Sequence, residues 1–156
     1  MHTLVASFVL AASLATAPGS PATGTASDDR LHGSRGADVL RGLRGDDHLN
    51  GRRGADRLYG GRGDDVLMDF LSVGTGGAPS ATRDVYRAGP GDDTLYVGHR
   101  DVVRAGKGAD HVWAFYVGAG DLVDCGAGSH DVLHLHEDLH GLETRGCEKI
   151  VIRVAG

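Results

Sequence analysis

Regularly spaced aspartates are the residues of this chain best placed to do chemistry. Asp38, Asp47, Asp56 and Asp65 recur at an interval of nine residues, and each closes a Gly-x-x-Gly-x-Asp segment. Such a segment folds into a tight turn that brings several backbone carbonyl groups beside the carboxylate. Carbonyl and carboxylate oxygens are the ligands that hard cations prefer. The spacing therefore predicts a series of cation sites in these turns.

The turns belong to a repeat. Residues 33–68 divide into four nine-residue units, GSRGADVLR, GLRGDDHLN, GRRGADRLY and GGRGDDVLM. After each aspartate we expect a short strand, in which the seventh and ninth residues face outward and the eighth faces the core. The predicted core stack is Leu40, Leu49, Leu58 and Leu67.

Stacking of alternate units gives the cation a structural role. Asp38 should lie over Asp56, and Asp47 over Asp65, at the strand spacing of about 4.8 Å. Like charges repel at that distance, and a cation between them converts the repulsion into shared ligation.

The units resemble the calcium-binding nonapeptides of repeats-in-toxin (RTX, hemolysin-type) proteins, whose pattern is G-G-x-G-x-D-x-U-x with U a large aliphatic residue. The resemblance implies an all-β fold, a parallel β-roll or β-helix-like solenoid in which two units make one coil, with Ca²⁺ as the ligand. One departure is that the second glycine is replaced by Ser34, Leu43 and Arg52 and kept at Gly61. We expect the turns at the three replacements to be looser or differently shaped.

The repeat breaks and then returns. We divide the chain into a first repeat block (31–68), a degenerate coil or loop (69–83), a second repeat block (84–117) and a C-terminal cap unit (118–156). Aspartates of the second block are spaced by 9, 8 and 9 residues, at Asp84, Asp93, Asp101 and Asp110. Complete glycine turns precede only Asp93 and Asp110. The predicted calcium ligands are the carboxylates of Asp38, Asp47, Asp56, Asp65, Asp93 and Asp110 and the carbonyls of Gly36, Gly45, Gly54, Gly63, Gly91 and Gly108.

The N-terminal residues 1–26 read as a secretory signal peptide and linker. An apolar run is followed by small residues, with cleavage either after Ala17 or nearer Ala26. The run is too short for a membrane anchor. The sequence therefore predicts an extracellular protein, with association at the cell surface as a variant.

The last segment fits the atypical unit that repeat proteins place at the end of a stack. It resembles the C-terminal units of small secreted actinobacterial repeat proteins, which carry two cysteines. In an exported chain that resemblance implies a disulfide between Cys125 and Cys147, and two unpaired thiols would fit a reducing compartment.

Composition restricts the class of protein. The 156 residues include 26 glycines, only 5% are aromatic, and the net charge is −5. This describes one small domain at most, with little apolar material for a core. Composition alone is compatible with disorder, and the repeats indicate that order depends on an ion. The acidic balance argues against nucleic acid as a partner.

Three further groups have two interpretations each. The third repeat position is arginine in all four units, at Arg35, Arg44, Arg53 and Arg62. For these side chains we favour neutralisation of the neighbouring aspartates over contact with an anionic polymer. Four histidines lie close together in the sequence, and for them we favour solvated side chains over an adventitious zinc or nickel site: His130, His134, His136 and His140. For the aromatic cluster, we favour packing in the core or cap over contact with a carbohydrate or protein partner; its members are Trp113, Phe115 and Tyr116.

The leading hypothesis is a secreted calcium-binding β-roll whose folding is coupled to Ca²⁺ binding. The alternative is a cell-surface adhesion module, or one that binds a cell-wall or other anionic extracellular polymer, with the roll as scaffold. No serine or cysteine lies in a nucleophile context, so no enzyme is expected.

Overall fold

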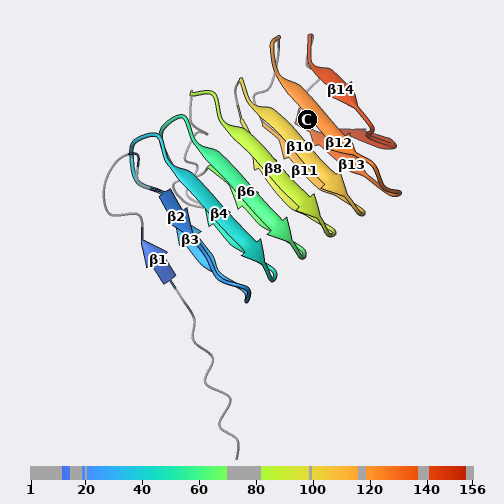
Figure 1. Ribbon diagram of the computed structural model, residues 1–156. Helices are drawn as coiled ribbons and strands as arrows, with labels where there is room; N and C mark the ends of the chain where they lie inside the picture. The colour runs from blue at the N-terminus through green and yellow to red at the C-terminus, as the bar shows by residue number, and fades with distance from the viewer. Residues whose placement is uncertain are drawn as a thin grey trace, which may run out of the picture.

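Two parallel β-sheets lie face to face and form a flattened solenoid (Figure 1). This computed structural model describes residues 12–14, 19, 21–69, 82–98, 100–115, 119–136 and 141–153. The described residues contain no helix. None of them therefore forms a helix able to cross a membrane.

The chain alternates between the two sheets strand by strand. The eight-stranded sheet consists, in spatial order, of β1 (Ala12–Leu14), β3 (Arg30–His32), β5 (His48–Asn50), β7 (Val66–Met68), β9 (Thr94–Val97), β11 (His111–Ala114), β13 (Val132–Leu135) and β15 (Lys149–Ile152). The seven-stranded sheet consists of β2 (Pro21–Thr23), β4 (Val39–Arg44), β6 (Arg57–Arg62), β8 (Val85–Pro90), β10 (Val102–Lys107), β12 (Leu122–Gly126) and β14 (Glu143–Arg145). Each strand is parallel to its neighbours, which confirms the predicted all-β parallel roll.

The eighth repeat position forms the core. Leu40 pairs with Leu58 and Leu49 with Leu67, and all four side chains are fully buried. Burial of one leucine side chain contributes about 2 kcal/mol, so a stack of such residues supplies much of the roll's apolar stabilisation.

The prediction that the ninth position faces solvent is wrong at Asn50 and Met68, which are buried. The side-chain oxygen of Asn50 accepts the Arg52 N–H, which draws the amide into the turn. Met68 lies in register between Asn50 and Tyr96, so large neighbours flank it on both sides.

The roll begins before the first recognised repeat. Gly24 to His32 form an additional nine-residue unit with Asp29 at its sixth position, and Leu31 at its eighth position is fully buried. Residues 21–23, expected in the linker, form β2 and pair with β4. β1 lies within the segment expected as a signal peptide and pairs with β3.

The segment between the two repeat blocks adds no described strand to either sheet. β6 pairs directly with β8, and β7 pairs directly with β9. Equivalent aspartates are 18 residues apart before this segment, 28 residues apart across it, and 17 residues apart after it. The segment is therefore an insertion of ten residues into a single turn.

A disulfide links the last coils. Cys125 and Cys147 are 22 residues apart and bonded, as the resemblance implied. β15 forms the closing strand, but Ile150 and Ile152 remain 47% exposed, so the described residues cover the C-terminal end of the stack only partly.

Candidate metal centre: two ladders of buried aspartates

The sixth-position aspartates form two ladders on opposite edges of the roll. We call the turns that lead into the eight-stranded sheet the Asp65 edge, and the turns that lead into the seven-stranded sheet the Asp56 edge. The Asp65 edge carries Asp29, Asp47, Asp65, Asp93, Asp110 and Asp131. The Asp56 edge carries Asp38, Asp56, Asp84, Asp101 and Asp121. All eleven side chains are buried.

In most ladder members, one carboxylate oxygen accepts a backbone N–H from the preceding coil. Asp65 Oδ1 accepts the Asp47 N–H at 2.9 Å, and Asp93 Oδ1 accepts the Asp65 N–H at 2.8 Å. On the other edge, Asp56 Oδ1 accepts the Asp38 N–H at 2.7 Å. The stacking predicted for Asp38 over Asp56, and for Asp47 over Asp65, is therefore present as a hydrogen-bonded chain.

The second oxygen, Oδ2, distinguishes two kinds of turn. In the first two units a hydroxyl residue at the second position satisfies it. Thr25 donates its N–H and hydroxyl to Asp29 Oδ2, at 2.5 and 3.0 Å. Ser34 donates its N–H and hydroxyl to Asp38 Oδ2 in the same way, at 2.5 and 2.8 Å. These two carboxylates have both oxygens occupied by the protein.

Six later turns leave Oδ2 buried without a hydrogen-bond partner in the part of the chain that the structure describes. This holds for Asp47, Asp56, Asp65, Asp84, Asp93 and Asp110. A buried polar atom without a partner costs about 1–3 kcal/mol, and more when it is charged. Six such oxygens in stacked turns fit cation ligation, because a divalent ion satisfies carboxylate oxygens and neutralises their charge at once.

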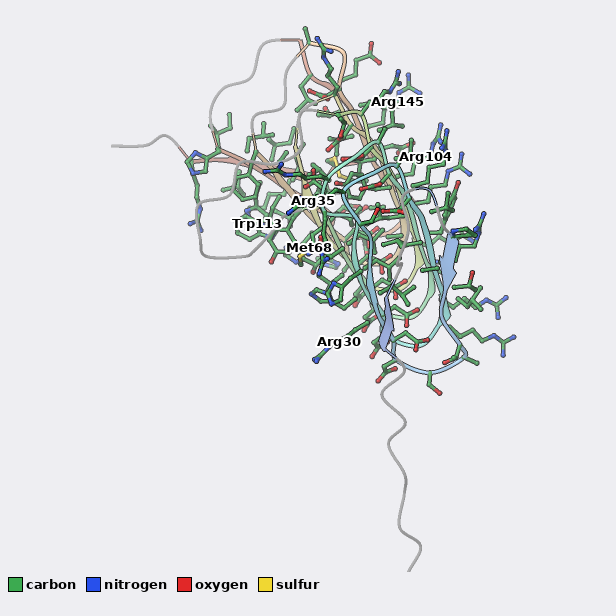
Figure 2. All side chains as sticks on the ribbon, turned by 90° about the vertical axis from the view of Figure 1, so that its left-hand side faces the viewer. Arg30, Arg35, Met68, Arg104, Trp113 and Arg145 are labelled. Carbon is green, nitrogen blue, oxygen red and sulfur yellow. A yellow bond between two sulfur atoms is a disulfide. The ribbon has the colours of Figure 1, made fainter. Side chains whose placement is uncertain are left out.

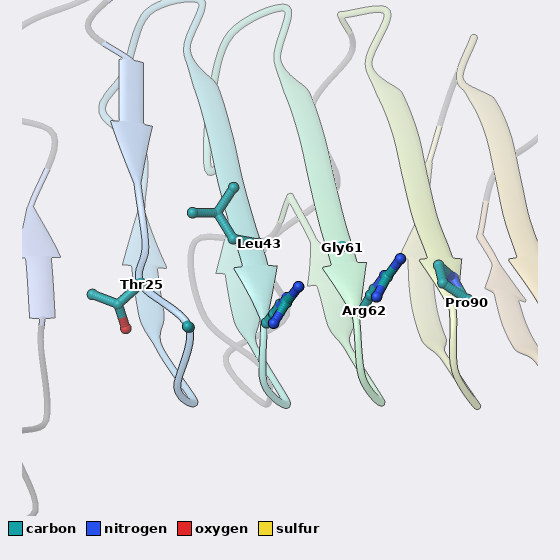
Figure 3. A pocket seen from close by; sticks show the side chains of 7 residues that line it. Thr25, Leu43, Gly61, Arg62 and Pro90 are labelled. Atoms are coloured by element: carbon teal, nitrogen blue, oxygen red, sulfur yellow. The ribbon is translucent and has the colours of Figure 1, made fainter.

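Backbone conformation at the second position explains the difference. Along the Asp65 edge this position is Thr25, then Leu43, then Gly61 (Figure 3). Leu43 has φ of 94° and Gly61 has φ of 133°, whereas Thr25 is not left-handed. Arg52, on the other edge, also has positive φ, at 72°. Leu43 and Arg52 thus adopt the backbone conformation of glycine, and neither they nor Gly61 donates a hydrogen bond to Oδ2.

The fourth-position glycines stack closely. Along the Asp65 edge, a Cβ added to Gly63 would lie 2.3 Å from the Gly45 carbonyl oxygen, and one added to Gly91 would lie 2.0 Å from the Gly63 oxygen. The stack brings these carbonyls to the edge that carries the aspartates. The other predicted carbonyl ligands lie in equivalent turns: Gly36 and Gly54 on the Asp56 edge and Gly108 on the Asp65 edge.

Burial raises the pKa of the ladder carboxylates. Desolvation is the largest cause, backbone N–H donors oppose it, and neighbouring aspartates add to it, so that the pKa of Asp47 and of Asp110 rises to about 6. The same causes raise the pKa of Asp56, Asp65 and Asp93 to about 7. Burial and the facing carboxylates raise the pKa of Asp84 well above its usual range. Without a cation, these groups therefore resist ionisation.

The predicted aspartate ligands fall into two groups in the structure. Asp47, Asp56, Asp65, Asp93 and Asp110 present a buried Oδ2 without a partner, whereas the Oδ2 of Asp38 is bonded to Ser34. Asp84 presents a buried Oδ2 of the same kind, but it was not among the predicted ligands because its unit has lost the turn glycines. The signal that separates Asp38 was visible, since Ser34 is the only hydroxyl residue at the second position of the four repeats.

The remaining candidate groups lie on the surface. Arg44 and Arg62 are in register on β4 and β6, and the ion pair seen among the described residues joins Arg145 to Glu143.

Trp113 lies on the outer face of the eight-stranded sheet, in register with Tyr96 and His134, and stacks on His134 at a centroid distance of 3.8 Å. Of the packing in the core or cap that we favoured, packing of Trp113 in the core is therefore wrong, whereas its stacking on His134 is a contact with the C-terminal cap unit. Tyr116 and His140 lie outside the described residues.

Comparison with known proteins agrees with this geometry. A family model described as the RTX calcium-binding nonapeptide repeat (four copies) matches residues 23–58, 32–67 and 80–112. The matched segments cover half of the chain and include the unit at residues 24–32. No curated protein and no solved structure matches the chain. On its repeats, its roll and its aspartate turns, the chain belongs to the RTX calcium-binding nonapeptide repeat family.

Proposed function

We propose that this protein is a secreted calcium-binding β-roll whose folding is coupled to Ca²⁺ binding. The observation that carries the proposal is the set of buried Oδ2 atoms without partners, stacked coil over coil. The proposed side-chain ligands are Asp47, Asp56, Asp65, Asp93 and Asp110. The proposed carbonyl ligands are Gly45, Gly54, Gly63, Gly91 and Gly108. Asp38 is left out because Ser34 satisfies its carboxylate. The proposal assigns no catalytic role to the chain.

Coupling to folding follows from where the charges lie. Ladder carboxylates approach one another only in the folded roll, so the cation site exists only there. Binding to the native state alone stabilises it by RT ln(1 + [L]/Kd), or about 2.7 kcal/mol at a hundredfold excess over Kd. Extracellular sites of this class need bind only at about 0.1–1 mM.

Two features support secretion. The apolar N-terminal run followed by small residues is typical of a signal peptide. The Cys125–Cys147 disulfide fits an oxidising compartment. Export would then expose the chain to calcium and start its folding.

Calcium titration calorimetry of two neighbouring variants tests the ligand assignment. Asp65 is buried with a free Oδ2, whereas Asp64 in the same turn is exposed and accepts the Asp92 N–H. Asp65→Asn should lower the calcium affinity at least tenfold for the sites that it borders, and Asp64→Asn should change it less than twofold. Equal effects of the two substitutions would refute ligation by the buried ladder.

A second candidate function rests on the outer face of the seven-stranded sheet. One row runs in register through Arg41, Tyr59, Arg87, Arg104, Asp124 and Arg145. The arginines of this row are exposed, and Arg41 and Arg87 lie over the Tyr59 ring, at 5.3 and 5.8 Å from its centroid. Figure 2 shows Arg104 and Arg145 on the side of the molecule opposite Trp113. We propose that this row binds an anionic extracellular polymer, with the roll as its scaffold.

Sedimentation with purified cell wall tests this second candidate. The triple variant Arg41→Gln, Arg87→Gln, Arg104→Gln should lose binding, and wild-type binding should weaken as salt is raised. The matched control is Arg35→Gln with Arg53→Gln, which removes third-position arginines from the Asp56 edge. Retained binding in the triple variant would exclude this surface.

A further inference from the structure

Three buried carboxylates converge where the insertion joins the roll. Asp69 follows β7, Asp84 precedes β8, and Asp101 precedes β10. One oxygen from each lies within 4.8 Å of the other two. None of the three side chains is more than 1% exposed.

Asp69 has no counterpart in the regular repeats. It occupies the first position of its unit, which is glycine at residues 33, 42, 51 and 60. At that position in regular turns a side chain would collide with the ladder, since a Cβ on Gly42 would lie 2.1 Å from Asp47 Oδ2. A Cβ on Gly60 would likewise lie 2.2 Å from Asp65 Oδ2. The longer turn between Asp69 and Asp84 places a third carboxylate where other turns hold none.

The other two carboxylates are ladder members held by backbone donors. Asp101 Oδ1 accepts the Asp84 N–H at 3.0 Å, and Asp101 Oδ2 accepts the Gly98 N–H at 2.8 Å. Asp84 Oδ1 accepts the Asp56 N–H at 2.6 Å, whereas Asp84 Oδ2 has no hydrogen-bond partner. The cluster is thus fixed in place by the sheet and still has an unsatisfied oxygen.

Tyr86 provides an independent sign that something binds here. Among the described residues it is the largest fully buried side chain, and its hydroxyl has no hydrogen-bond partner there. Tyr86 lies two residues after Asp84 on β8 and pairs with Val103, which lies two residues after Asp101 on β10, so its ring lies beside the strands that follow two of the three carboxylates. Leucine or valine fills most equivalent core positions. An unpaired hydroxyl there costs about 1–3 kcal/mol, which a ligand would recover.

We propose that Asp69, Asp84 and Asp101, together with the Tyr86 hydroxyl, bind one calcium ion at a site distinct from the glycine-turn sites. Three carboxylates and a phenolic oxygen form a hard, oxygen-only ligand set. When they are ionised, carboxylates packed this closely repel one another, and a divalent cation between them offsets that repulsion. The ion would tie both ends of the insertion to the roll, through Asp69 on one side and Asp84 on the other.

Ion counting tests the site. Wild-type protein dialysed against excess calcium and then analysed by atomic emission should hold one ion more than Asp69→Asn. The circular dichroism of the two proteins in saturating calcium should agree. The matched control is Asp92→Asn, an exposed aspartate on the opposite edge, which should keep the wild-type count. Equal counts in wild type and Asp69→Asn would overturn the proposal.

A second variant covers the case in which Asp69→Asn does not fold. Tyr86→Phe removes only the hydroxyl and keeps the core filled. With Tb³⁺ as the probe, excitation of tyrosine should give sensitised lanthanide emission that falls severalfold in Tyr86→Phe. The control Tyr59→Phe, on the outer face of β6, should retain it. Equal emission from Tyr86→Phe and wild type would overturn the site, whereas a wild type that binds no ion at all would refute the proposed function as well.

Discussion

At the scale of single residues, the second position of each repeat decides how the buried aspartate is satisfied. A hydroxyl residue at that position donates a hydrogen bond to Oδ2, as Thr25 does to Asp29 and Ser34 does to Asp38. Glycine, or a residue forced into positive φ, donates nothing and leaves the oxygen for a cation. Aspartates in near-identical sequence contexts thereby acquire different chemistry.

Leu43 gives a residue-scale prediction about strain. A left-handed conformation costs a non-glycine residue roughly 1–2 kcal/mol, and Leu43 has φ of 94° while being 46% exposed. Leu43→Gly should therefore raise the free energy of unfolding in calcium by about 1 kcal/mol, measured by urea denaturation. Leu43→Ala, which removes the exposed side chain and keeps the strain, should give no such gain. A gain of equal size in both variants would contradict the strain argument.

At the scale of elements, a nine-residue pattern predicted most of the strands. Position eight locates the core and position six locates the ladders, because the alternation of side chains is fixed once the register is known. The repeat does not predict the strand at residues 21–23, since Ala22 is a small residue without the repeat's glycines around it. Nor does it predict the carboxylate cluster, because Asp69 is fifteen residues from Asp84 in the sequence and only the fold brings the two carboxylates together.

The disulfide gives an element-scale prediction. Cys125 is fully buried on β12, and its bond to Cys147 ties the last coil to the coil before it. For a loop of 22 residues, loss of the bond should lower the free energy of unfolding by roughly 3 kcal/mol in the chain-entropy model. Urea denaturation of the double variant Cys125→Ala, Cys147→Ala in calcium measures this. An unchanged midpoint would show that the C-terminal coils fold independently of the bond.

At the scale of the whole molecule, the roll lacks the apolar material of an ordinary domain and gathers negative charge along two edges. Its core is a stack of leucine, valine and alanine side chains with one tyrosine and the disulfide-bonded Cys125. Repulsion within the ladders destabilises the roll whenever their carboxylates are charged and no cation lies between them. Order in this protein should therefore depend on solution conditions more than on packing.

The pH dependence of the calcium-free roll is a prediction at this scale. The pKa of Asp56, Asp65 and Asp93 is about 7 in the folded chain and about 3.8 ordinarily. A raised folded-state pKa gives stability that is complete below about pH 4 and lost as pH rises through about 7. In chelator, the urea midpoint should therefore be higher near pH 5 than near pH 8. Burial lowers the pKa of His32, His48 and His134, which acts in the opposite sense but involves fewer groups.

Calcium should reverse this trend, because it requires the same carboxylates to be ionised. Its apparent affinity should fall as the solution is acidified from about pH 8 to about pH 5. A calcium-free roll that gains stability with rising pH would contradict the assignment of the ladder carboxylates.

Far-UV circular dichroism tests the central claim most directly. The chain from Pro18 onward, which retains β2, would be titrated with calcium from zero to about 10 mM, with magnesium as the control. We expect a coil spectrum in chelator that changes cooperatively to β-structure with calcium and not with magnesium. A β-spectrum that is the same in chelator and in calcium would contradict coupled folding and show that the apolar stack and the disulfide hold the roll without an ion.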